Sequence, residues 1–317
     1  MEKGDNEELK RVLRVDSRGP VVVRLMGGLG NQMFQYAFGR RIAEDGKVEV
    51  KYDIVSGFKC DAYGRRFSLD GLNLDVCAAR AHEIPIGVRW TKPWNQVSKV
   101  MWSAAPKQWR RAVYDRAPYD FVPSIVRDIS PSTYFFGYWQ NERYFLPIKD
   151  VLREHCSLRL RHSVQGIALK KEIEGCRSIS LHIRRNLGFD AEGRIVPKAR
   201  DYYRNYDSDY YRKALRAIGY DKSSVCFVFA DNPTWAKENL SLPVSCIFVA
   251  DTGRYSDSEE LLLMASCEHH VISNSSFGYW GAWLGSNPER IVVAPDEWAN
   301  EVKNSEKGFC PNTWKMI

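Results

Sequence analysis

The sequence predicts an α/β protein made of two domains, each built on a parallel sheet whose faces are covered by helices. Three observations support this prediction. The chain has 317 residues, enough for two domains of ordinary size. One β-α-β unit is readable between Pro20 and Asp53, and after Ser178 short apolar runs alternate regularly with amphipathic stretches. Ligands of such sheets bind at the carboxyl ends of the strands, where the motifs described below are found.

The predicted organisation is a polar leader over residues 1–19, an N-terminal domain over residues 20–165 and a C-terminal domain over residues 166–317. The boundary falls within a helical connection over residues 146–177 that is rich in Lys and Arg. Residues 54–130 are expected to be irregular, because they show few clear periods.

The expected elements follow from apolar runs and their spacing. Branched apolar runs predict strands, and apolar residues at near-helical spacing predict helices. The expected strands are residues 21–25, 48–52, 178–182, 225–229, 244–249, 270–273 and 291–293. The expected helices are a stretch after residue 30, residues 209–218, a stretch that starts at residue 235, residues 258–267 and residues 277–284.

Composition excludes several classes of protein. Hydrophobic residues make up 44% and charged residues 27%, a balance typical of a globular chain rather than a disordered one. No run approaches the roughly 20 apolar residues of a membrane span. The acidic, polar start of the chain is unlike a secretory signal, so we expect a cytoplasmic protein. The eight cysteines are expected to be free thiols, because none forms a Cys-x-x-Cys pair.

The net charge of +7 narrows the choice of partners. A basic balance suits nucleic acid, an anionic membrane or a phosphorylated substrate. No nucleic-acid signature is present, so we expect a phosphorylated substrate and no nucleic acid. Residues 89–111 interleave tryptophans with basic residues, a pattern that can lie peripherally on the inner face of an anionic membrane. The alternative is a half-buried helix pair with solvated cations.

The stretch Met26–Gln32 is the strongest local motif. A buried strand leads into it and a helix follows, so its glycines occupy a tight strand-to-helix turn. Backbone N–H groups and the positive end of the helix dipole then point into one crevice, where an anionic or sugar ligand is favoured. Gly28 and Gly30 are expected to be glycine because a side chain there would keep a ligand off the backbone.

Three interpretations compete for this turn. A phosphate loop is rejected, because the last glycine is not followed by Lys and Ser or Thr. A dinucleotide fingerprint fits Gly28 and Gly30, and Asp53 stands where a ribose-binding acid belongs, although Met33 occupies the place of the third glycine. A plain corner without a ligand is the third interpretation.

The longer string MGGLGNQMFQYA (residues 26–37) resembles the opening motif of the α-1,2-fucosyltransferases, glycosyltransferase family eleven. Further blocks in the same order extend the resemblance over most of residues 20–295. It implies a GT-B-like fold, in which two Rossmann-type domains face each other across a cleft. The implied reaction is inverting transfer of L-fucose from GDP-fucose to the 2-hydroxyl of a galactoside, with no cofactor. Bacterial surface-glycan synthesis is the expected setting, with a galactose-terminated glycan as acceptor.

Two other classes of protein stay open. An NAD-dependent oxidoreductase or epimerase fits Gly28, Gly30 and Asp53. A non-catalytic sugar- or membrane-binding protein fits the basic and aromatic stretch over residues 89–111 and a missing carboxylate described next.

The string HIRR (residues 182–185) ends the first predicted strand of the second half. Arginines at a strand end offer permanently charged forks suited to a pyrophosphate. The family motif is H-x-R-R-x-D. The resemblance assigns Arg184 to the β-phosphate. We expect His182 on the donor side and Arg185 in an ion pair that holds the loop.

Leu187 stands where this motif has its Asp, which leaves the catalytic base open. Leucine cannot accept a proton. Asp190 can take the role if the loop is one turn longer, so the candidate catalytic residues are Arg184 and Asp190. Alternatively, a loose, oxocarbenium-like transition state needs little help from a base.

A second donor block is the string SNSSF (residues 273–277), which runs from a strand into a helix. Hydroxyls and backbone N–H groups at a helix N-terminus form an anion site. By the resemblance, Ser275, Ser276 and Phe277 contact the diphosphate and fucose.

Two acidic positions complete the predicted donor site. Asp231 follows a strand and resembles a family block on the nucleotide side. Glu260, rather than Glu259, aligns with a family acid that accepts the guanine N–H groups. The alternative for either glutamate is a favourable charge in the first turn of a helix.

The predicted acceptor side comes from the first half of the chain. Asn31 and Gln32 are expected to orient acceptor or donor at the cleft. Trp139 lies in an aromatic block over residues 135–145 and is expected to stack on the acceptor sugar. Core packing at a strand end is the alternative for such a ring.

A metal requirement is not expected. The string Asp207-Ser208-Asp209 looks like a metal-binding D-x-D, but no apolar strand precedes it and a helix follows, so Asp209 is interpreted as an N-cap. No other cluster has the ligand spacing of a hard cation.

Overall fold

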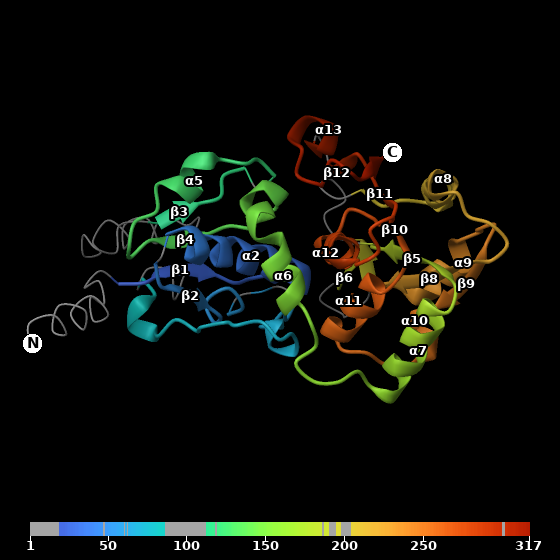
Figure 1. Cartoon of the computed structure of the whole chain (residues 1–317), viewed down its shortest axis with the longest axis horizontal. Coiled ribbons are helices and arrows are strands. Elements are labelled where there is room, and N and C mark those ends of the chain that lie inside the picture. The colour runs from blue at the N-terminus through green and yellow to red at the C-terminus, as the bar shows by residue number, and fades with distance from the viewer. Residues whose placement is uncertain are drawn as a thin grey trace, which may run out of the picture.

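The structure is a computed structural model in which residues 19–46, 48–59, 61, 63–85, 112–117, 119–185, 187–189, 195–197, 204–299 and 302–317 are described. Two α/β domains lie side by side, one around the N-terminal sheet and one around the C-terminal sheet (Figure 1). The predicted leader over residues 1–19 falls outside the described residues except for its last residue.

The sheet of the N-terminal domain is parallel and follows the order β2-β1-β4-β3 within the described part of the chain. Its strands are β1 (Val21–Arg24), β2 (Val50–Asp53), β3 (Ala112–Tyr114) and β4 (Tyr134–Phe136). The long helix α2 (Leu29–Gly46) follows β1 directly. The shorter helical segments are η1 (Leu69–Gly71), η2 (Ala81–Glu83), α5 (Pro123–Arg127), η4 (Glu142–Tyr144), η5 (Leu146–Ile148) and α6 (Lys149–His155).

The sheet of the C-terminal domain is also parallel, with the order β14-β11-β10-β5-β8-β9. Its strands are β5 (Arg177–Ile183), β8 (Ser224–Ala230), β9 (Ser245–Phe248), β10 (His269–Val271), β11 (Val292–Ala294) and β14 (Lys315–Met316). Its helices are α7 (Val164–Glu174), α8 (Ser208–Ile218), α9 (Pro233–Asn239), α10 (Val249–Thr252), α11 (Asp257–Ala265) and α12 (Ser276–Leu284). Two antiparallel pairs, β6 (Leu187–Phe189) with β7 (Ile195–Pro197) and β12 (Glu297–Ala299) with β13 (Val302–Lys303), and helix α13 (Asn304–Lys307) lie outside this sheet.

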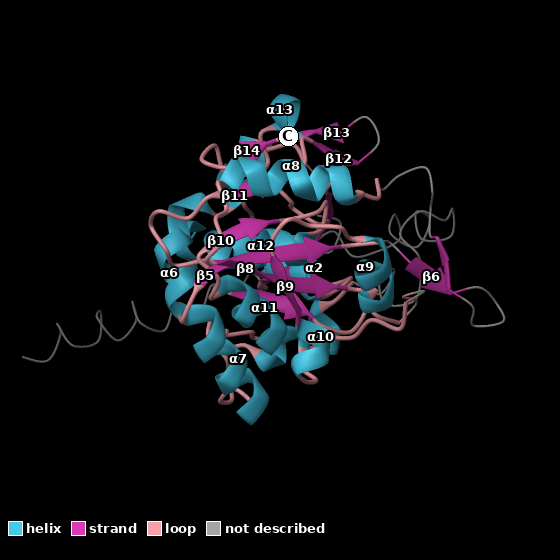
Figure 2. Ribbon diagram, turned by 90° about the vertical axis from the view of Figure 1, so that its right-hand side faces the viewer, coloured by secondary structure: helices cyan, strands magenta, loops and turns pink. Residues whose placement is uncertain are grey.

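Strand β8 shows why this sheet is covered on both faces. Its side chains alternate between two separate cores. Cys226 and Val228 pack in the core that α8 covers, whereas Phe227 and Phe229 pack in the core that α7 and α11 cover. Figure 2 shows α8 on one side of the sheet and α7, α10 and α11 on the other. A strand buried on both faces is continuously apolar, as β8 is after its first residue, Ser224.

The predicted fold class is confirmed, and most predicted elements are present within a few residues of their expected bounds. Two edge strands were not expected. β3 lies in the stretch expected to be irregular, and β14 has only two residues, too few for a period to be read. The predicted N-cap Asp209 is wrong, because the carboxylate of Asp207 accepts hydrogen bonds from the N–H groups of Asp209 and Tyr210.

The two domains share one hydrophobic core. Phe34 of α2 packs on Tyr279 and Trp280 of α12, with ring centroids 4.7 and 5.1 Å away. The C-terminal segment also returns to the N-terminal domain, where Lys307 lies 2.8 Å from Asp120. The predicted boundary after residue 165 stays a prediction, and it falls in the first turn of α7.

Candidate functional site

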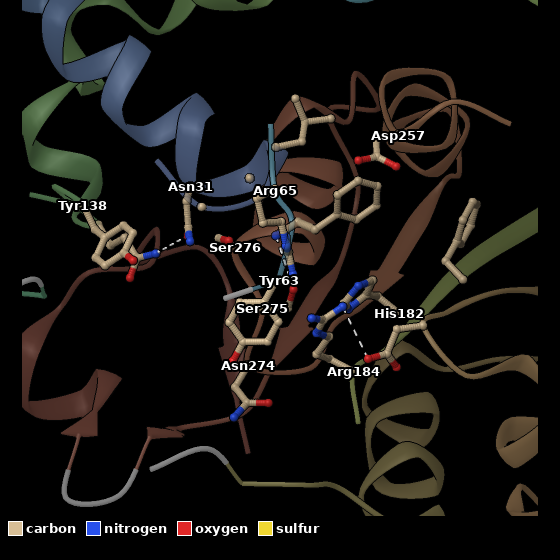
Figure 3. A pocket seen from close by; sticks show the side chains of 18 of the residues that line it. Asn31, Tyr63, Arg65, Tyr138, His182, Arg184, Asp257, Asn274, Ser275 and Ser276 are labelled. Carbon is tan, nitrogen blue, oxygen red and sulfur yellow. Dashed lines mark hydrogen bonds and ion pairs between the residues drawn. The ribbon is translucent and has the colours of Figure 1, made fainter. Parts of the chain in front are cut away.

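A cavity of about 650 Å³ lies between the two domains, at the carboxyl ends of strands from both sheets. It is lined by the turn that follows β1 and by residues that follow β5, β8 and β10. Arg184 and Ser275 therefore share one hollow (Figure 3), and Gly28 lines it as well. The walls comprise Gly27, Gly28, Leu29, Gly30, Asn31, Asp61, Tyr63, Arg65, Tyr119, Tyr138, Gln140, His182, Arg184, Phe229, Ala230, Asp231, Asp257, Glu260, Asn274, Ser275, Ser276, Phe277 and Trp298.

The glycine turn is shaped by protein neighbours as well as by the cavity. A Cβ at Gly28 would overlap the guanidinium of Arg65, with its Cζ atom 3.2 Å away. A Cβ at Gly30 would lie 2.5 Å from the backbone nitrogen of Phe277 and 2.6 Å from the carbonyl oxygen of Ser276. Close approach of a ligand is therefore not the only reason for these glycines. The structure adds that Gly28 admits an arginine and Gly30 admits the N-terminus of α12.

Asn31 and Gln32 have different environments. Asn31 lines the cavity, and its Oδ1 accepts a 2.8 Å hydrogen bond from the side chain of Gln140. Gln32 is fully buried and donates to the carbonyls of Gly27 and Arg66 at 2.8 and 2.9 Å. Its expected contact with a ligand is therefore corrected: Gln32 positions the turn against the loop over residues 66–68.

Trp139 is also corrected. Its ring is fully buried and lies stacked on Phe38, with centroids 4.3 Å apart and an interplanar angle of 10°. Asp115 accepts hydrogen bonds from the N–H groups of Tyr138 and Trp139 at 3.2 and 3.0 Å, and the backbone of Trp139 has φ of 55°. This turn directs the tryptophan into the core, while its neighbours Tyr138 and Gln140 line the cavity.

Arg184 lies at the end of β5 beside Asp231, with Nη1 3.3 Å from Oδ2 (Figure 3). Burial raises the pKa of Asp231, and the charge of Arg184 opposes that shift. The other carboxylate oxygen of Asp231 accepts the N–H of Arg185 at 2.9 Å. The expected ion pair of Arg185 is replaced, among the described residues, by a cation–π contact 3.8 Å from the ring of Trp235 and a hydrogen bond to the carbonyl of Tyr206.

His182 lines the cavity as a neutral ring. Its Nδ1 lies 3.0 Å from the hydroxyl of Ser273, and it is almost fully buried. Burial, and then the charge of Arg184, lower its pKa to about 3. His182 is therefore a poor proton acceptor at neutral pH. A Cβ at Gly278 would come 2.7 Å from Nδ1 of His182, so α12 packs directly on the imidazole ring.

Helix α12 points its N-terminus into the cavity. Ser275 is the N-cap, and its hydroxyl accepts the N–H of Phe277 at 3.3 Å. Ser276 and Phe277 form the first turn and line the same wall. Asn274, which the sequence analysis did not select, is buried and donates to the carbonyl of Trp298 at 2.8 Å, while its Oδ1 has no hydrogen-bond partner among the described residues.

The structure separates the two glutamates of α11. Glu259 accepts the N–H and hydroxyl of Ser163 at 2.6 and 3.0 Å and lies 3.4 Å from His162, away from the cavity. Glu260 lines the cavity. Burial, and then the charge of Asp257, raise the pKa of Glu260 to about 7.

The residues that the sequence analysis missed lie mostly on the N-terminal side. Asp61, Tyr63 and Arg65 come from a loop without periodicity, so no local signal marks them. The predicted base Asp190 and the side chain of Leu187 lie outside the described residues, so the role of Asp190 stays a prediction. The basic and aromatic stretch over residues 89–111 also lies outside them.

Asp53, the acid that the dinucleotide interpretation needs for a ribose, is engaged inside the protein. Asp53 is fully buried and accepts a 2.7 Å hydrogen bond from the hydroxyl of Tyr134. Its other oxygen accepts the N–H groups of Val55 and Ser56 at 3.1 and 2.9 Å. A carboxylate engaged in this way has no free face for a ribose.

The next observations, on metal ligands and membrane spans, concern only the residues that the structure describes. There, no three His, Cys, Asp or Glu side chains gather as ligands of one metal ion, so metal independence stays a prediction. Within the same residues no helix is both long and apolar enough to span a bilayer. The seven described cysteines are all free.

Comparison with known proteins decides the family. A family model described as glycosyl transferase family 11 matches residues 20–317. The chain belongs to glycosyl transferase family 11. The resemblance inferred from the motifs is confirmed, and the chain is a glycosyltransferase with a GT-B-like fold.

Two curated relatives of this glycosyltransferase come from Escherichia coli. This chain is 30% identical over 313 residues to an alpha-1,2-colitosyltransferase, and the match covers 94% of this chain and 98% of that protein. It is 25% identical over 290 residues to the O-antigen biosynthesis glycosyltransferase WbnK, covering 86% and 93%.

Solved structures of fucosyltransferases are more distant. NodZ α-1,6-fucosyltransferase soaked with GDP-fucose shares 16% identity, with coverage of 84% and 92% and a TM-score of 0.48. A mutant of Arabidopsis thaliana FUT1 in complex with GDP shares 14% identity, with coverage of 92% and 75% and a TM-score of 0.46.

Proposed function

We propose that this glycosyltransferase transfers L-fucose from GDP-fucose to the 2-hydroxyl of a galactoside, with inversion and without a metal ion. The observation that carries the proposal is the interdomain cavity, where Arg184, the N-terminus of α12 and Glu260 line one continuous wall. A permanent cation, a helix dipole and an acceptor carboxylate are the groups that a guanosine diphosphate needs.

The nucleotide end of the donor is assigned to Glu260. As a carboxylate, it can accept both the N1–H and the N2–H₂ of guanine, a pairing that adenine and pyrimidines do not offer. The diphosphate lies between Arg184 and the backbone N–H groups that open α12. Ser275, Ser276 and Phe277 then border the fucose.

The acceptor approaches from the N-terminal wall. Asn31, Gln140 and Tyr138 lie there at the opening of the glycine turn. They supply amide and hydroxyl groups that can hold sugar hydroxyls, and a ring on which a pyranose can pack.

The reaction is a single displacement. The acceptor 2-oxygen forms a bond to the anomeric carbon while the bond from that carbon to the β-phosphate oxygen breaks, and the acceptor proton leaves to a base or to solvent. Negative charge grows on the leaving oxygen, where a positioned donor such as Arg184 is worth about 2.7–4 kcal/mol. His182 is not the base, because its pKa lies near 3. Asp190 stays the candidate base, with a loose transition state as the alternative.

A second donor is favoured by one comparison. The relative at 30% identity, matched along nearly its whole length, is an alpha-1,2-colitosyltransferase. Colitose is fucose without its 3-hydroxyl group, so the same cavity can serve either sugar. The name of the other relative supports a setting in O-antigen synthesis, a bacterial surface glycan.

The experiment is a transfer assay with purified protein in EDTA, using GDP-fucose or its 3-deoxy analogue and a panel of galactosides. We expect one donor to give an α-1,2-linked product that NMR identifies. Release of GDP with no galactoside product would contradict the acceptor assignment. No reaction with either donor would contradict the donor assignment.

We also propose peripheral contact with the inner membrane through the basic and aromatic stretch over residues 89–111. The argument is the sequence pattern alone. Replacing Arg110 and Arg111 by Glu should weaken binding to vesicles that contain anionic lipid, and unchanged binding would contradict the contact.

A further inference from the structure

A second guanidinium enters the cavity from the domain opposite Arg184. Arg65 belongs to the loop that follows β2 in the N-terminal domain, and Figure 3 shows its side chain in the same hollow as Arg184. No sequence motif singles out this arginine, and the proposed reaction above gives it no role.

The loop is built to hold Arg65 in place. Asp61 accepts the N–H groups of Tyr63 and Arg65 at 2.8 and 3.0 Å, and these hydrogen bonds hold the backbone that carries the arginine side chain. On the other side, Gln32 donates to the carbonyl of Arg66 and accepts the N–H of Ser68, each at 2.9 Å. Hydrogen bonds thus hold the backbone on both sides of the arginine, and all of them except the one from Tyr63 are partly buried.

Gly28 leaves the space that the guanidinium occupies. A Cβ at this position would overlap Nη1 of Arg65, so any other residue would displace it. The guanidinium therefore lies directly over the glycine turn, beside the N-terminus of α2. This placement explains one glycine of the motif by a contact between two segments of the same domain.

The charge of Arg65 is not balanced locally. Among the described residues, no carboxylate forms an ion pair with its guanidinium, which lies 5.4 Å from the centroid of the Tyr63 ring. Asp61 and Asp257 are near enough to favour the charged form. The pKa of Arg65 is lowered, first by burial and then by the charge of Arg184. Two guanidinium groups and the N-termini of α2 and α12 thus face one cavity, an arrangement that an anion with several charges relieves.

We propose that Arg65 is a donor-binding residue, and that its guanidinium and that of Arg184 grip the diphosphate from the two domains at once. The bound diphosphate then ties the domains together across the cavity. Gly28 and Asp61 are positioning residues for this contact. The inference rests on the proposed function, which places a nucleoside diphosphate in the cavity.

The test compares Arg65→Gln with the matched control Arg66→Gln, using calorimetric titration with GDP and competition with guanosine. Arg66 is the exposed next residue of the same loop, so the two variants lose the same charge. We expect Arg65→Gln to weaken GDP binding by about 10- to 100-fold, the loss of one or two charge-assisted hydrogen bonds, and to leave guanosine binding unchanged. Arg66→Gln should bind both like the wild type, and Arg65→Lys should lose less than Arg65→Gln.

The stability of Arg65→Gln distinguishes a binding role from a structural role. The ligand-free Tm of Arg65→Gln should equal or exceed that of the wild type, because the variant removes a repulsion, whereas its stabilisation by GDP should shrink. A double-mutant cycle with Arg184→Gln should show coupling for GDP and none for guanosine.

The outcomes separate the two proposals. Wild-type affinity for GDP in Arg65→Gln, or equal losses for GDP and guanosine, overturns the inference and leaves the proposed function intact. A wild-type protein that binds no guanosine diphosphate overturns both.

Discussion

The two walls of the cavity differ in how their charges are balanced. On the C-terminal wall, Arg184 lies 3.3 Å from Asp231, so the pair is nearly neutral without a ligand. On the N-terminal wall, Arg65 has no such partner among the described residues. The charge of Arg184 on the C-terminal wall is therefore balanced without a ligand, whereas the charge of Arg65 on the N-terminal wall needs an anionic ligand to balance it.

The walls also differ in support. Arg184 and Asp231 stand at the ends of adjacent, fully paired strands of the larger sheet. Arg65 stands on a loop that is held by Asp61 and Gln32 and packed over Gly28. We therefore expect Trp139, behind the N-terminal wall, to act on stability, and Arg184, in the C-terminal wall, to act on turnover.

Trp139→Ala should have the largest effect, and on stability alone. The ring is fully buried behind the N-terminal wall and stacked on Phe38, so its loss should lower the free energy of unfolding by about 3–5 kcal/mol. Urea unfolding measures this loss. The KM for the acceptor, measured where the variant is folded, should stay within about twofold. A large rise in KM would return the ring to the acceptor site.

Arg184→Ala should lower kcat by about 100- to 1,000-fold, the cost of removing a donor aimed at a developing charge. The control is Arg177→Ala at the other end of the same strand, where the arginine pairs with Asp221 at 2.7 Å on the surface. That variant should retain wild-type kcat. Equal effects of the two variants would mean that Arg184 acts only through the stability of β5.

Gly30→Ala and Gly28→Ala separate the two roles of the glycine turn. Alanine at 30 meets the backbone of α12, so the domains must shift, and we expect a loss of about 1–3 kcal/mol in unfolding free energy. Alanine at 28 meets only the flexible end of Arg65, so it should reproduce the weaker GDP binding of Arg65→Gln with little loss of stability. Equal stability of both variants would contradict the close packing of Gly30 on α12.

The pH dependence of donor binding should show the smallest effect. Guanine requires the ionised carboxylate of Glu260, whose pKa is about 7, so the KM for the donor should rise about tenfold from pH 8 to pH 6. Glu260→Gln should bind the donor weakly at both pH values. Asp257→Asn should move the midpoint to lower pH, since Asp257 raises this pKa. A profile that is flat in the wild type would remove Glu260 from the guanine site.

The same pKa has a consequence for stability. A carboxyl with a raised pKa binds more protons in the folded chain than in the unfolded chain. Its contribution to stability is therefore present below about pH 4.5 and is lost as pH rises towards 7. Glu260→Gln should flatten that slope in urea unfolding, and an unchanged slope would assign it to other groups.

The C-terminal wall could largely be predicted from the sequence because its residues sit at fixed offsets from regular elements. Arg184 follows a strand, Ser275 caps a helix, and Glu260 lies one helical step from Glu259 on the cavity side. Local patterns carry this information. The same offsets failed by one residue where the backbone turns sharply, at Trp139, whose neighbours Tyr138 and Gln140 line the cavity.

The N-terminal wall could not be predicted in the same way. Arg65 reaches the cavity only because Gly28, more than thirty residues earlier, leaves room for it. Such a contact is tertiary and leaves no period in the sequence. Gln32 was misassigned for a related reason, since its partners at residues 66 and 68 belong to that same loop.

The central claim is that a nucleoside diphosphate is held between the two domains by groups from both. Hydrogen–deuterium exchange with and without saturating GDP tests it most directly. The account predicts slower exchange in two places, the loop over residues 63–68 and the start of α12 at residues 275–278. Slower exchange confined to the C-terminal domain would contradict it.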